Sequence, residues 1–402
     1  MKVEQWPIER LKPYAKNPRK NDRAVPGVAE SIKAFGFRQP IVVDAHDVII
    51  VGHTRWKAAK SLGLKTVPVH VANISEDKAR AYRLADNRLN EKSAWDVQLL
   101  GVEISELRMQ GVDCEMLGFS ASEIKKMSPE TQKELERENA VPEKAPTRVW
   151  PGELWALGEH RLLCGDASAE RSWAILMGKK MADMVFTDPP YGVDRLESNK
   201  ALDKWDGGHR QKSGKIENDG GEEEIRKTVL PALTLALAHT KGGGCWYVAV
   251  PAGPPHIVFS QWMLDAGAWR QTLNWCKDSM VLGRSDYHYQ HEPILYGWKP
   301  GAAHREPPTR DQTTVWNIAR PRASREHPTM KPVELVERAI ANSSADGELV
   351  VDPFLGSGTT VIAASKTGRV GYGMELSPVY CDVILKRWEI YSGERARRVG
   401  SE

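Results

Sequence analysis

The chain has 402 residues, of which 41% are hydrophobic and 27% charged, with a formal net charge of +3. This composition is that of a folded globular protein, and the length predicts two or three domains. The five cysteines are odd in number and spread out, which favours neither a disulfide framework nor a zinc site, and we expect no metal. No stretch reaches the roughly 20 apolar residues of a membrane span, and the N-terminus lacks a signal peptide. We therefore expect a cytoplasmic protein without a membrane partner.

The first 120 residues predict a small α+β domain. Alternating apolar residues between turn residues indicate short strands, and Gly63 ends a helix that begins at Thr54. A second helix is predicted from about Ser75, a typical N-cap residue, to Ala85. The predicted strands are 39–44, 48–51 and 66–71.

A polar, charged and proline-containing stretch at 121–149 cannot bury much surface and predicts a linker. Residues 150–392 then alternate short apolar strands with helices, which predicts an α/β domain with a mostly parallel sheet. Residues 393–402 are rich in arginine and predict a frayed tail. In the second domain we expect strands at 184–187, 245–250, 348–352 and 371–374, and helices at 229–237 and 359–366.

One strand of this second domain ends in an acid, Asp352, and leads into a glycine-bearing loop. The glycines allow a tight turn, and the helix that follows offers free N–H groups to an anion or a carboxylate. The next strand ends in Glu375, which is placed to accept hydrogen bonds from ribose hydroxyls. The pattern favours a nucleoside ligand without phosphate, because the Gly-Lys-Ser/Thr ending of a triphosphate loop is missing. The alternative is a loop that only packs a helix on a strand. The loop and helix start comprise Gly356, Gly358, Thr359 and Thr360.

A second motif, Asp188-Pro189-Pro190-Tyr191, follows the strand at 184–187. Two prolines fix the backbone and donate no N–H, so their carbonyls keep free lone pairs. Asp188 adds an acceptor at a strand end, and Tyr191 adds an aromatic face. Such an array suits a planar base that carries an amino group and has been flipped out of a duplex. On local chemistry alone, a plain turn remains the alternative.

Together, the two motifs resemble those of the amino-methyltransferase family of DNA modification enzymes. The catalytic motif precedes the cofactor motif, as in the circularly permuted β class. Two further stretches fit that class: 163–167 resembles its Gly-Asp element, and 327–332 resembles its His-Pro-Thr-x-Lys-Pro motif. The resemblance covers about 150–392 and implies a Rossmann-like domain that binds S-adenosylmethionine. The implied cofactor-binding residues are Asp166, Lys331, Asp352, Phe354, Gly356, Gly358, Thr359, Thr360 and Glu375.

The resemblance also implies roles for single residues. Asp166 would face the cofactor adenine, Phe354 would line the cofactor, and the motif that contains Lys331 would hold its methionine end. Asp188 and the Pro189 carbonyl would hold the target amino group while Tyr191 stacks on the base. No metal is implied.

The target implied by the resemblance is adenine N6 in double-stranded DNA. Asp188 in the first motif position favours adenine, whereas relatives that act on cytosine N4 more often carry Ser there. Methylation at cytosine C5 is disfavoured, because no cysteine follows a proline. Three alternatives stay open: cytosine N4, RNA as the substrate, and a ParB-like DNA-binding regulator whose methyltransferase half only senses the cofactor. The sequence also leaves open a homodimer, a partner nuclease and the recognition site.

We expect target reading within about 192–326. From Lys299 to Lys331 there are seven Lys and Arg against three acids, with Trp298 and Trp316 interspersed, a mixture that suits phosphate contact and base-edge reading. A solvated loop is the alternative. The loop 194–221, with its two Gly-Gly pairs, is expected to close over DNA. The predicted DNA contacts are Arg320, Arg322 and Arg325.

The N-terminal domain resembles the ParB/sulfiredoxin-like family over about 1–92. The stretch 52–59 fits its Gly-x-x-Arg-x-x-Ala-Ala box, and 12–19 and 31–36 fit its opening. The resemblance implies a nucleotide site at Gly52, His53 and Arg55, or an accessory role in DNA binding or partner docking. His53 and Thr54 depart from the Glu and Arg that are usual in ParB, so nucleotide binding and accessory docking both stay open.

Overall fold

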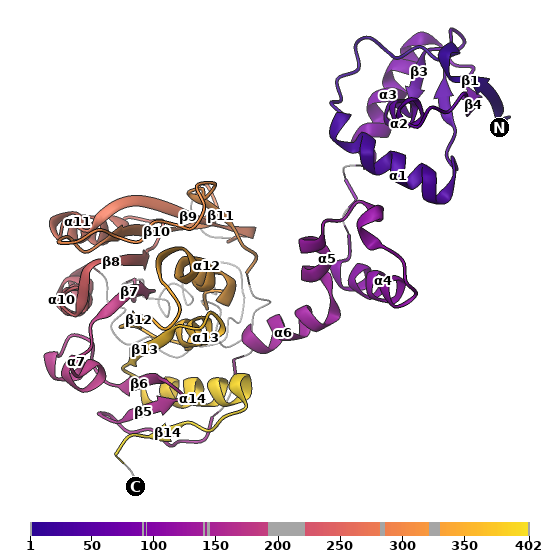
Figure 1. The fold of residues 1–402 in the computed structure, drawn as a ribbon. Coiled ribbons are helices and arrows are strands. Elements are labelled where there is room, and N and C mark those ends of the chain that lie inside the picture. Colours follow the sequence, from indigo (N-terminus) through magenta and orange to yellow (C-terminus); the bar gives the residue numbers. More distant parts are fainter. Residues whose placement is uncertain are drawn as a thin grey trace, which may run out of the picture. The chain divides into compact units, whose positions relative to one another are not determined.

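The computed structural model describes residues 2–90, 92–93, 95–139, 141–142, 145–191, 222–281, 286–320 and 330–400. The chain divides into two compact units, Met1–Leu135 and Glu136–Glu402 (Figure 1). In the described ranges, no helix is both long and apolar enough to cross a bilayer.

The N-terminal unit contains a four-stranded sheet in the order β1-β4-β2-β3 within the described residues. Strand β2 runs parallel to β4, and the outer pairs β1–β4 and β2–β3 are antiparallel. Apolar residues at alternate positions of β2 and β4 are fully buried and form the core with the helices, as the period of two in a half-buried strand requires. The elements are β1 (Glu4–Pro7), α1 (Val25–Phe35), β2 (Ile41–Val43), β3 (Ile49–Val51), α2 (His53–Ser61), β4 (Thr66–Val71) and α3 (Glu76–Asn90).

A second, smaller core follows within this unit. Helix α4 (Val97–Met109) and a 3-10 turn, Cys114–Leu117, pack with α5 (Ala121–Met127) around Ile104, Cys114 and Ile124. Ser120 caps α5 with a full capping box, which defines where that helix starts. The predicted linker, 121–149, is therefore partly helical, since α5 and α6 (Pro129–Asn139) both lie inside it.

The C-terminal unit is built on a ten-stranded sheet in the order β11-β9-β10-β8-β7-β12-β13-β6-β5-β14 among the described residues. The five central strands, from β8 to β6, are parallel, so the predicted mostly parallel α/β fold is confirmed. Strands β10 and β5 flank them in antiparallel orientation. The strands are β5 (Leu154–Leu157), β6 (His160–Cys164), β7 (Ala182–Thr187), β8 (Thr240–Ala249), β9 (Trp269–Val281), β10 (Tyr289–Trp298), β11 (Val315–Asn317), β12 (Leu349–Asp352), β13 (Val370–Glu375) and β14 (Arg397–Arg398).

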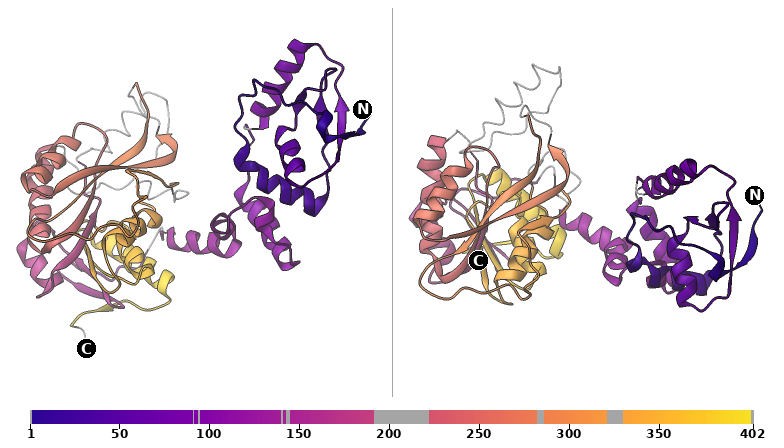
Figure 2. Two further views of the ribbon diagram at one scale, coloured as in Figure 1. Left: turned by 45° about the horizontal axis from the view of Figure 1, so that its top comes forward. Right: turned by 90° about the horizontal axis from the view of Figure 1, so that it is seen from above.

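Helices cover both faces of this sheet, as in a Rossmann-like fold (Figures 1 and 2). Successive residues of one strand point to opposite faces, so Val185 enters the core with Trp173, while Phe186 enters the core with Leu335. One face carries α7 (Glu170–Met177), α10 (Leu230–Ala238) and α11 (His256–Asp265), and the other carries α12 (Val333–Ser343), α13 (Thr359–Lys366) and α14 (Pro378–Ser392).

The segment 192–326, within which target reading is predicted outside the buried strands, supplies strands β9 and β10 and helices α10 and α11 to the sheet and its cover. One expectation from the sequence is wrong in this unit. The sequence predicts a frayed tail from 393, but β14 pairs with β5, and Ala396 is buried beside α14. Residues 401–402 and the predicted loop 194–221 lie outside the described residues.

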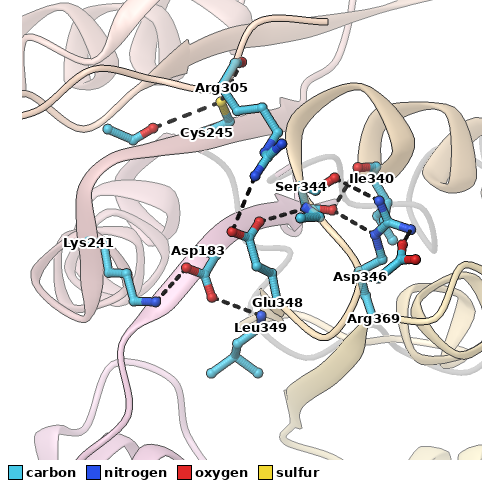
Figure 3. Close-up of polar contacts among 12 residues, drawn as sticks. Asp183, Lys241, Cys245, Arg305, Ile340, Ser344, Asp346, Glu348, Leu349 and Arg369 are labelled. Carbon is cyan, nitrogen blue, oxygen red and sulfur yellow. Dashed lines mark hydrogen bonds and ion pairs between the residues drawn. The ribbon is translucent and has the colours of Figure 1, made fainter. Parts of the chain in front are cut away.

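The amino ends of the central strands are joined by polar contacts (Figure 3). The carboxylate of Asp183 on β7 accepts hydrogen bonds from the Leu349 backbone N–H at 2.9 Å and from the Lys241 ammonium at 2.5 Å. Arg305 pairs with Glu348 at 3.6 Å beside them. These contacts hold β7, β8 and β12 together at their amino ends. An open α/β sheet binds its ligands on the other side, beyond the carboxyl ends of its strands.

Gly297 offers a test of the close packing between β9 and β10. It lies at a register shift between β10 and β9, and a Cβ there would sit 1.7 Å from the carbonyl oxygen of Ala268. We expect Gly297→Ala to lower the free energy of unfolding by about 1–3 kcal/mol, because the backbone must move to relieve the overlap. Urea denaturation of the full chain measures this change. The matched control is Gly253→Ala, where the nearest atom is 3.9 Å away; an equal loss there would contradict the steric explanation.

Candidate active site

The candidate site lies at the point of the sheet where the strand order reverses, between β7 and β12. Strand β7 is followed by its neighbour β8 on one side, and β12 is followed by β13 on the other side, while β7 and β12 pair directly in parallel. Ligands of doubly wound sheets bind in the crevice that forms at such a switch point. The Thr187 hydroxyl at the end of β7 donates to the Asp352 carboxylate at the end of β12, at 2.8 Å across 165 residues of sequence. One hydrogen bond therefore joins the two predicted motifs.

Asp352 holds this junction together and is itself only 3% exposed. Besides Thr187, its carboxylate accepts from the Thr360 hydroxyl at 2.6 Å and from the Phe354 backbone N–H at 3.0 Å. Burial raises the pKa of Asp352 to about 6, and these hydrogen bonds oppose the rise. The sequence predicts a cofactor contact for Asp352. The structure uses its carboxylate to fix the glycine loop and the end of β7, which is a positioning role.

The glycine loop is also fixed from the next strand. The Glu375 carboxylate accepts from the Gly356 N–H at 3.0 Å and from the Ser377 N–H at 2.9 Å. Gly358 has φ +86 at the start of α13, and a Cβ there would approach Ile384 to 3.1 Å, so both conformation and space favour glycine. The structure thus brings together, at the carboxyl ends of the neighbouring strands β12 and β13, the predicted residues Gly356, Gly358, Thr359, Thr360 and Glu375.

Arg387 on α14 supports the same loop, and no pattern in the sequence indicates it. Its guanidinium donates to the Ser357 carbonyl at 2.8 Å and to the Thr359 hydroxyl at 3.1 Å. A second nitrogen donates to the Glu138 carbonyl at 2.7 Å, which anchors the end of α6 to this unit. Burial lowers the pKa of Arg387 to about 9, which still leaves it cationic at neutral pH.

The predicted catalytic motif forms a hydrogen-bonded cluster. The Asp188 carboxylate, which follows β7, accepts from the Lys331 ammonium at 2.7 Å and from the Tyr191 hydroxyl. Lys331 also donates to the Tyr191 hydroxyl at 3.2 Å. Pro189 is buried and Pro190 half-buried beside them. The cluster therefore presents Asp188, whose side chain is 28% exposed, as the accessible charged group next to the glycine loop.

Lys331, whose motif is predicted to hold the methionine end of the cofactor, lies between the catalytic motif and the glycine loop. Its ammonium is buried and bonds to Asp188, and only its carbonyl meets the cofactor loop, by accepting from Thr359 at 3.4 Å. A buried ammonium requires carboxylate partners, and here Asp188 supplies one of them. Burial alone would lower the pKa of Lys331, but the carboxylates of Asp188 and Glu292 raise it well above its usual value. The preceding residues of that motif, 327–329, lie outside the described residues.

Two further charged residues belong to this cluster and were missed from the sequence. Glu292 on β10 pairs with Lys331 at 2.9 Å and with Lys277 on β9 at 2.5 Å. Burial would raise the pKa of Glu292, but the two ammonium groups lower it to about 2. The available signal was Glu292 itself, an acid directly before the apolar run 293–296 inside β10.

The remaining predicted cofactor residues also lie beyond the carboxyl ends of the central strands. Asp166 follows β6, is exposed, and accepts from the Ser168 N–H and hydroxyl, both at 2.8 Å. Phe354 follows β12 and is half-buried. A shallow depression of about 540 Å³, open to solvent, adjoins the Asp166 loop and is lined by Ser168, Glu170, Arg226 and residues of α10. Because β6, β13, β12 and β7 are sheet neighbours, their acidic ends form one row.

The predicted DNA-contacting stretch, 299–331, is divided between the two ends of the sheet. Lys299 donates to the Ala238 and Thr240 carbonyls at the amino ends of the strands, where Arg305 also lies. Trp316 is buried in the core, so it cannot stack on a base. Arg320 lies at the end of the sheet that carries the site and bonds to Asp278 and Ser279. Arg322 and Arg325 lie outside the described residues.

The predicted nucleotide box of the N-terminal unit lies at the start of α2. Gly52 has φ +105 and precedes the helix, and His53 accepts a hydrogen bond from the Tyr14 N–H at 3.2 Å. Burial lowers the pKa of His53 to about 4. Arg55 donates to the Gln39 and Pro40 carbonyls at 2.8 and 3.1 Å. The Arg55 side chain therefore stabilises the turn into β2 in this structure.

Comparison with known proteins assigns the family. A sequence profile described as DNA methylase matches residues 182–386, just over half of the chain. The chain belongs to the DNA methylase family. A profile of the ParB N-terminal domain matches residues 1–88, so the predicted combination of a DNA amino-methyltransferase domain with a ParB-like domain is confirmed. Asp188, Lys331, Asp352 and Glu375 all lie inside the matched methylase range.

Individual relatives agree with this assignment. The methylase is 26% identical over 240 residues to the type II methyltransferase M2.DpnII of Streptococcus pneumoniae, which covers 53% of this chain and 84% of the relative. It is 32% identical over 138 residues to the DNA adenine methyltransferase YhdJ of Escherichia coli, covering 30% of this chain and 47% of the relative. Among solved structures, a putative DNA modification methylase of Thermus thermophilus, complexed with S-adenosyl-L-methionine, has a TM-score of 0.40 and 22% identity, covering 58% of this chain and 94% of that one.

The buried Asp352 predicts how the stability of this methylase depends on pH. Its pKa rises from an ordinary 3.8 to about 6 in the folded chain, so between these values the folded state holds a proton that the unfolded state releases. Its contribution to stability is therefore complete below about pH 4, declines as the pH rises to about 6, and stays constant above that. Asparagine cannot titrate. In Asp352→Asn we therefore expect the free energy of unfolding to decline less steeply over this range, by up to about 1.4 kcal/mol per pH unit.

Urea denaturation from pH 4 to pH 7 measures this dependence. The control is Asp265→Asn, at an exposed carboxyl at the end of α11, which should keep the decline of the wild type. A decline of unchanged slope in Asp352→Asn would show that Asp352 does not titrate in this window.

Proposed function

We propose that this DNA methylase uses S-adenosylmethionine to methylate adenine N6 in double-stranded DNA after flipping the base out of the helix. One observation carries the proposal: the Thr187–Asp352 hydrogen bond places the Asp188 motif directly beside the glycine loop. A loop for the methyl donor and an acceptor for the amino group then lie side by side at the carboxyl ends of β7 and β12. The adenine methyltransferase among the relatives supports the choice of base.

The residues at the crevice suit the proposed cofactor. S-adenosylmethionine combines a nucleoside with a sulfonium and carries no phosphate. Glu375 and the exposed Asp166 provide carboxylate acceptors for ribose hydroxyls and an adenine amino group, at the ends of neighbouring strands. When bound, the cofactor supplies an electrophilic methyl group.

The protein's part in the reaction follows from the acceptors at the end of β7. The Asp188 carboxylate and the Pro189 carbonyl accept the two hydrogens of the target amino group, which directs the nitrogen lone pair toward the methyl group. On methyl transfer, positive charge would develop on the nitrogen, and the Asp188 carboxylate would stabilise it. One amino proton would then pass from the nitrogen to the Asp188 carboxylate, which accepts its hydrogen bond. Tyr191, whose hydroxyl is fixed by Asp188 and Lys331, borders this position with its ring.

Cytosine N4 is the second candidate target, since the same acceptors would fit its amino group. Asp188 in the first motif position favours adenine over this alternative. A regulator that only senses the cofactor would have no use for a partly exposed Asp188 held by a buried Lys331 beside the loop, which disfavours that interpretation. For the ParB-like unit we propose an accessory role in binding DNA, supported by the family match over 1–88.

The direct test is incubation of the full chain with labelled cofactor and unmethylated double-stranded DNA, followed by digestion to nucleosides. We expect labelled N6-methyldeoxyadenosine. Asp188→Ala should lower turnover by about 10²-fold or more, because a preorganised acceptor is lost, while the cofactor still binds. The matched control is Asp265→Ala on α11, with turnover unchanged. Label in N4-methyldeoxycytidine would favour the second candidate, and label in RNA alone would reject DNA as the substrate.

Glu375→Ala tests the cofactor half separately. The change removes a ribose acceptor and also releases the Gly356 and Ser377 N–H groups. Hydrogen bonds to charged groups contribute about 1.5–3 kcal/mol, so we expect cofactor affinity to fall by roughly 10–100-fold in calorimetry. Glu306→Ala, at an exposed acid of the same unit, is the control. Wild-type affinity in Glu375→Ala would remove Glu375 from the cofactor site.

A further inference from the structure

The Lys331 ammonium makes two hydrogen bonds and one ion pair. It donates to the Asp188 carboxylate at 2.7 Å and to the Tyr191 hydroxyl at 3.2 Å, and it pairs with the Glu292 carboxylate at 2.9 Å. Its side chain is 7% exposed, so it has little access to water. The ammonium position is therefore set by these three groups, and through it the orientation of the Asp188 carboxylate.

Glu292 is held in turn from the neighbouring strand. One oxygen pairs with Lys331 and the other with Lys277 on β9, whose side chain is 6% exposed. The four groups alternate in sign in the order Asp188, Lys331, Glu292, Lys277, and their formal charges cancel. We call these four residues the charge row. The row begins at Lys277 on β9 and ends at Asp188, which follows β7.

The charge row matters for a reaction that develops positive charge. With Lys331 alone beside it, Asp188 would be neutralised, and the ammonium would repel the charge that forms on the amino nitrogen. Glu292 offsets the Lys331 charge, so Asp188 can keep its effect on the target. Burying two ammonium groups beside two partly buried carboxylates is costly, and apolar side chains of similar volume are often as stable or more so. The arrangement is therefore hard to explain by fold stability.

We propose that Glu292, fixed by Lys277, is a positioning residue for methyl transfer: it holds and neutralises the Lys331 ammonium so that Asp188 remains oriented and negative toward the target amino group. This inference rests on the proposed function. Glu292 does not touch the substrate; it acts through Lys331.

The test compares Glu292→Gln with the wild-type chain on duplex DNA. This variant keeps the size of the side chain and removes its charge. We expect kcat to fall roughly 30–100-fold, with KM for DNA and the affinity for S-adenosylmethionine changed less than about threefold, and a melting temperature close to that of the wild type. The matched control is Glu348→Gln. It removes the charge of an acid that pairs with Arg305 at the amino ends of the strands, and it should leave kcat unchanged.

Two readouts separate positioning from simple structural damage. The groups that face Lys331 are Asp188, Tyr191 and Glu292, with Lys277 behind Glu292. Glu292 is one of the two carboxylates that raise the pKa of Lys331 against the effect of burial. Without it, the pKa of Lys331 should fall, so the kcat defect should shrink as the pH is raised. Adding Lys277→Met to Glu292→Gln removes the other uncompensated cation and should restore part of the rate.

The outcomes are distinguishable. A wild-type chain that transfers no methyl group to DNA would overturn the proposed function and this inference with it. An active wild type with an equally active Glu292→Gln would overturn the inference alone. So would a variant whose defect is independent of pH and follows a loss of melting temperature or cofactor binding.

Discussion

The buried carboxylate of Asp352 is the contact on which the site depends. It joins the end of β7 to the start of α13 through two threonine hydroxyls, so the target motif and the glycine loop cannot move apart without breaking hydrogen bonds in the core. The parallel pairing of β7 and β12 brings the strands together, but pairing alone leaves their loops free. Asp352 fixes those loops, although burial disfavours its charged form.

Charged side chains lie at both ends of the parallel strands of the large sheet. At the amino ends, Asp183 and Glu348 bond to backbone and cations. At the carboxyl ends, Asp352 bonds to both loops in the core, while Asp166 is exposed and Asp188 is partly accessible. Charged groups therefore hold the strands together at both ends. The basic stretch 299–331 reaches both ends as well, since Arg305 lies at the amino ends and Arg320 at the carboxyl ends.

Elements with a strong local pattern could be predicted from the sequence. The helix over 359–366 and the strand over 66–71 match α13 and β4 at both ends, because glycine, proline and apolar spacing mark their limits. Strands β9 and β10 were missed, since their polar and aromatic residues lack a clean period of two. The short strand β14 was missed because arginines carry no signal of pairing. Trp316 was assigned to an exposed reading stretch, although an isolated tryptophan is more often core.

The sequence by itself determined the family, the two motifs and their order, because each motif is a run of adjacent residues whose chemistry can be read locally. Only the tertiary structure decided which groups those motifs meet. Lys331 is 143 residues from its partner Asp188, and Lys277 reaches Glu292 across two strands. Such contacts depend on strand order and register, and no local spacing encodes them. The burial that makes these charges seek partners also exists only once the sheet and its helices have packed.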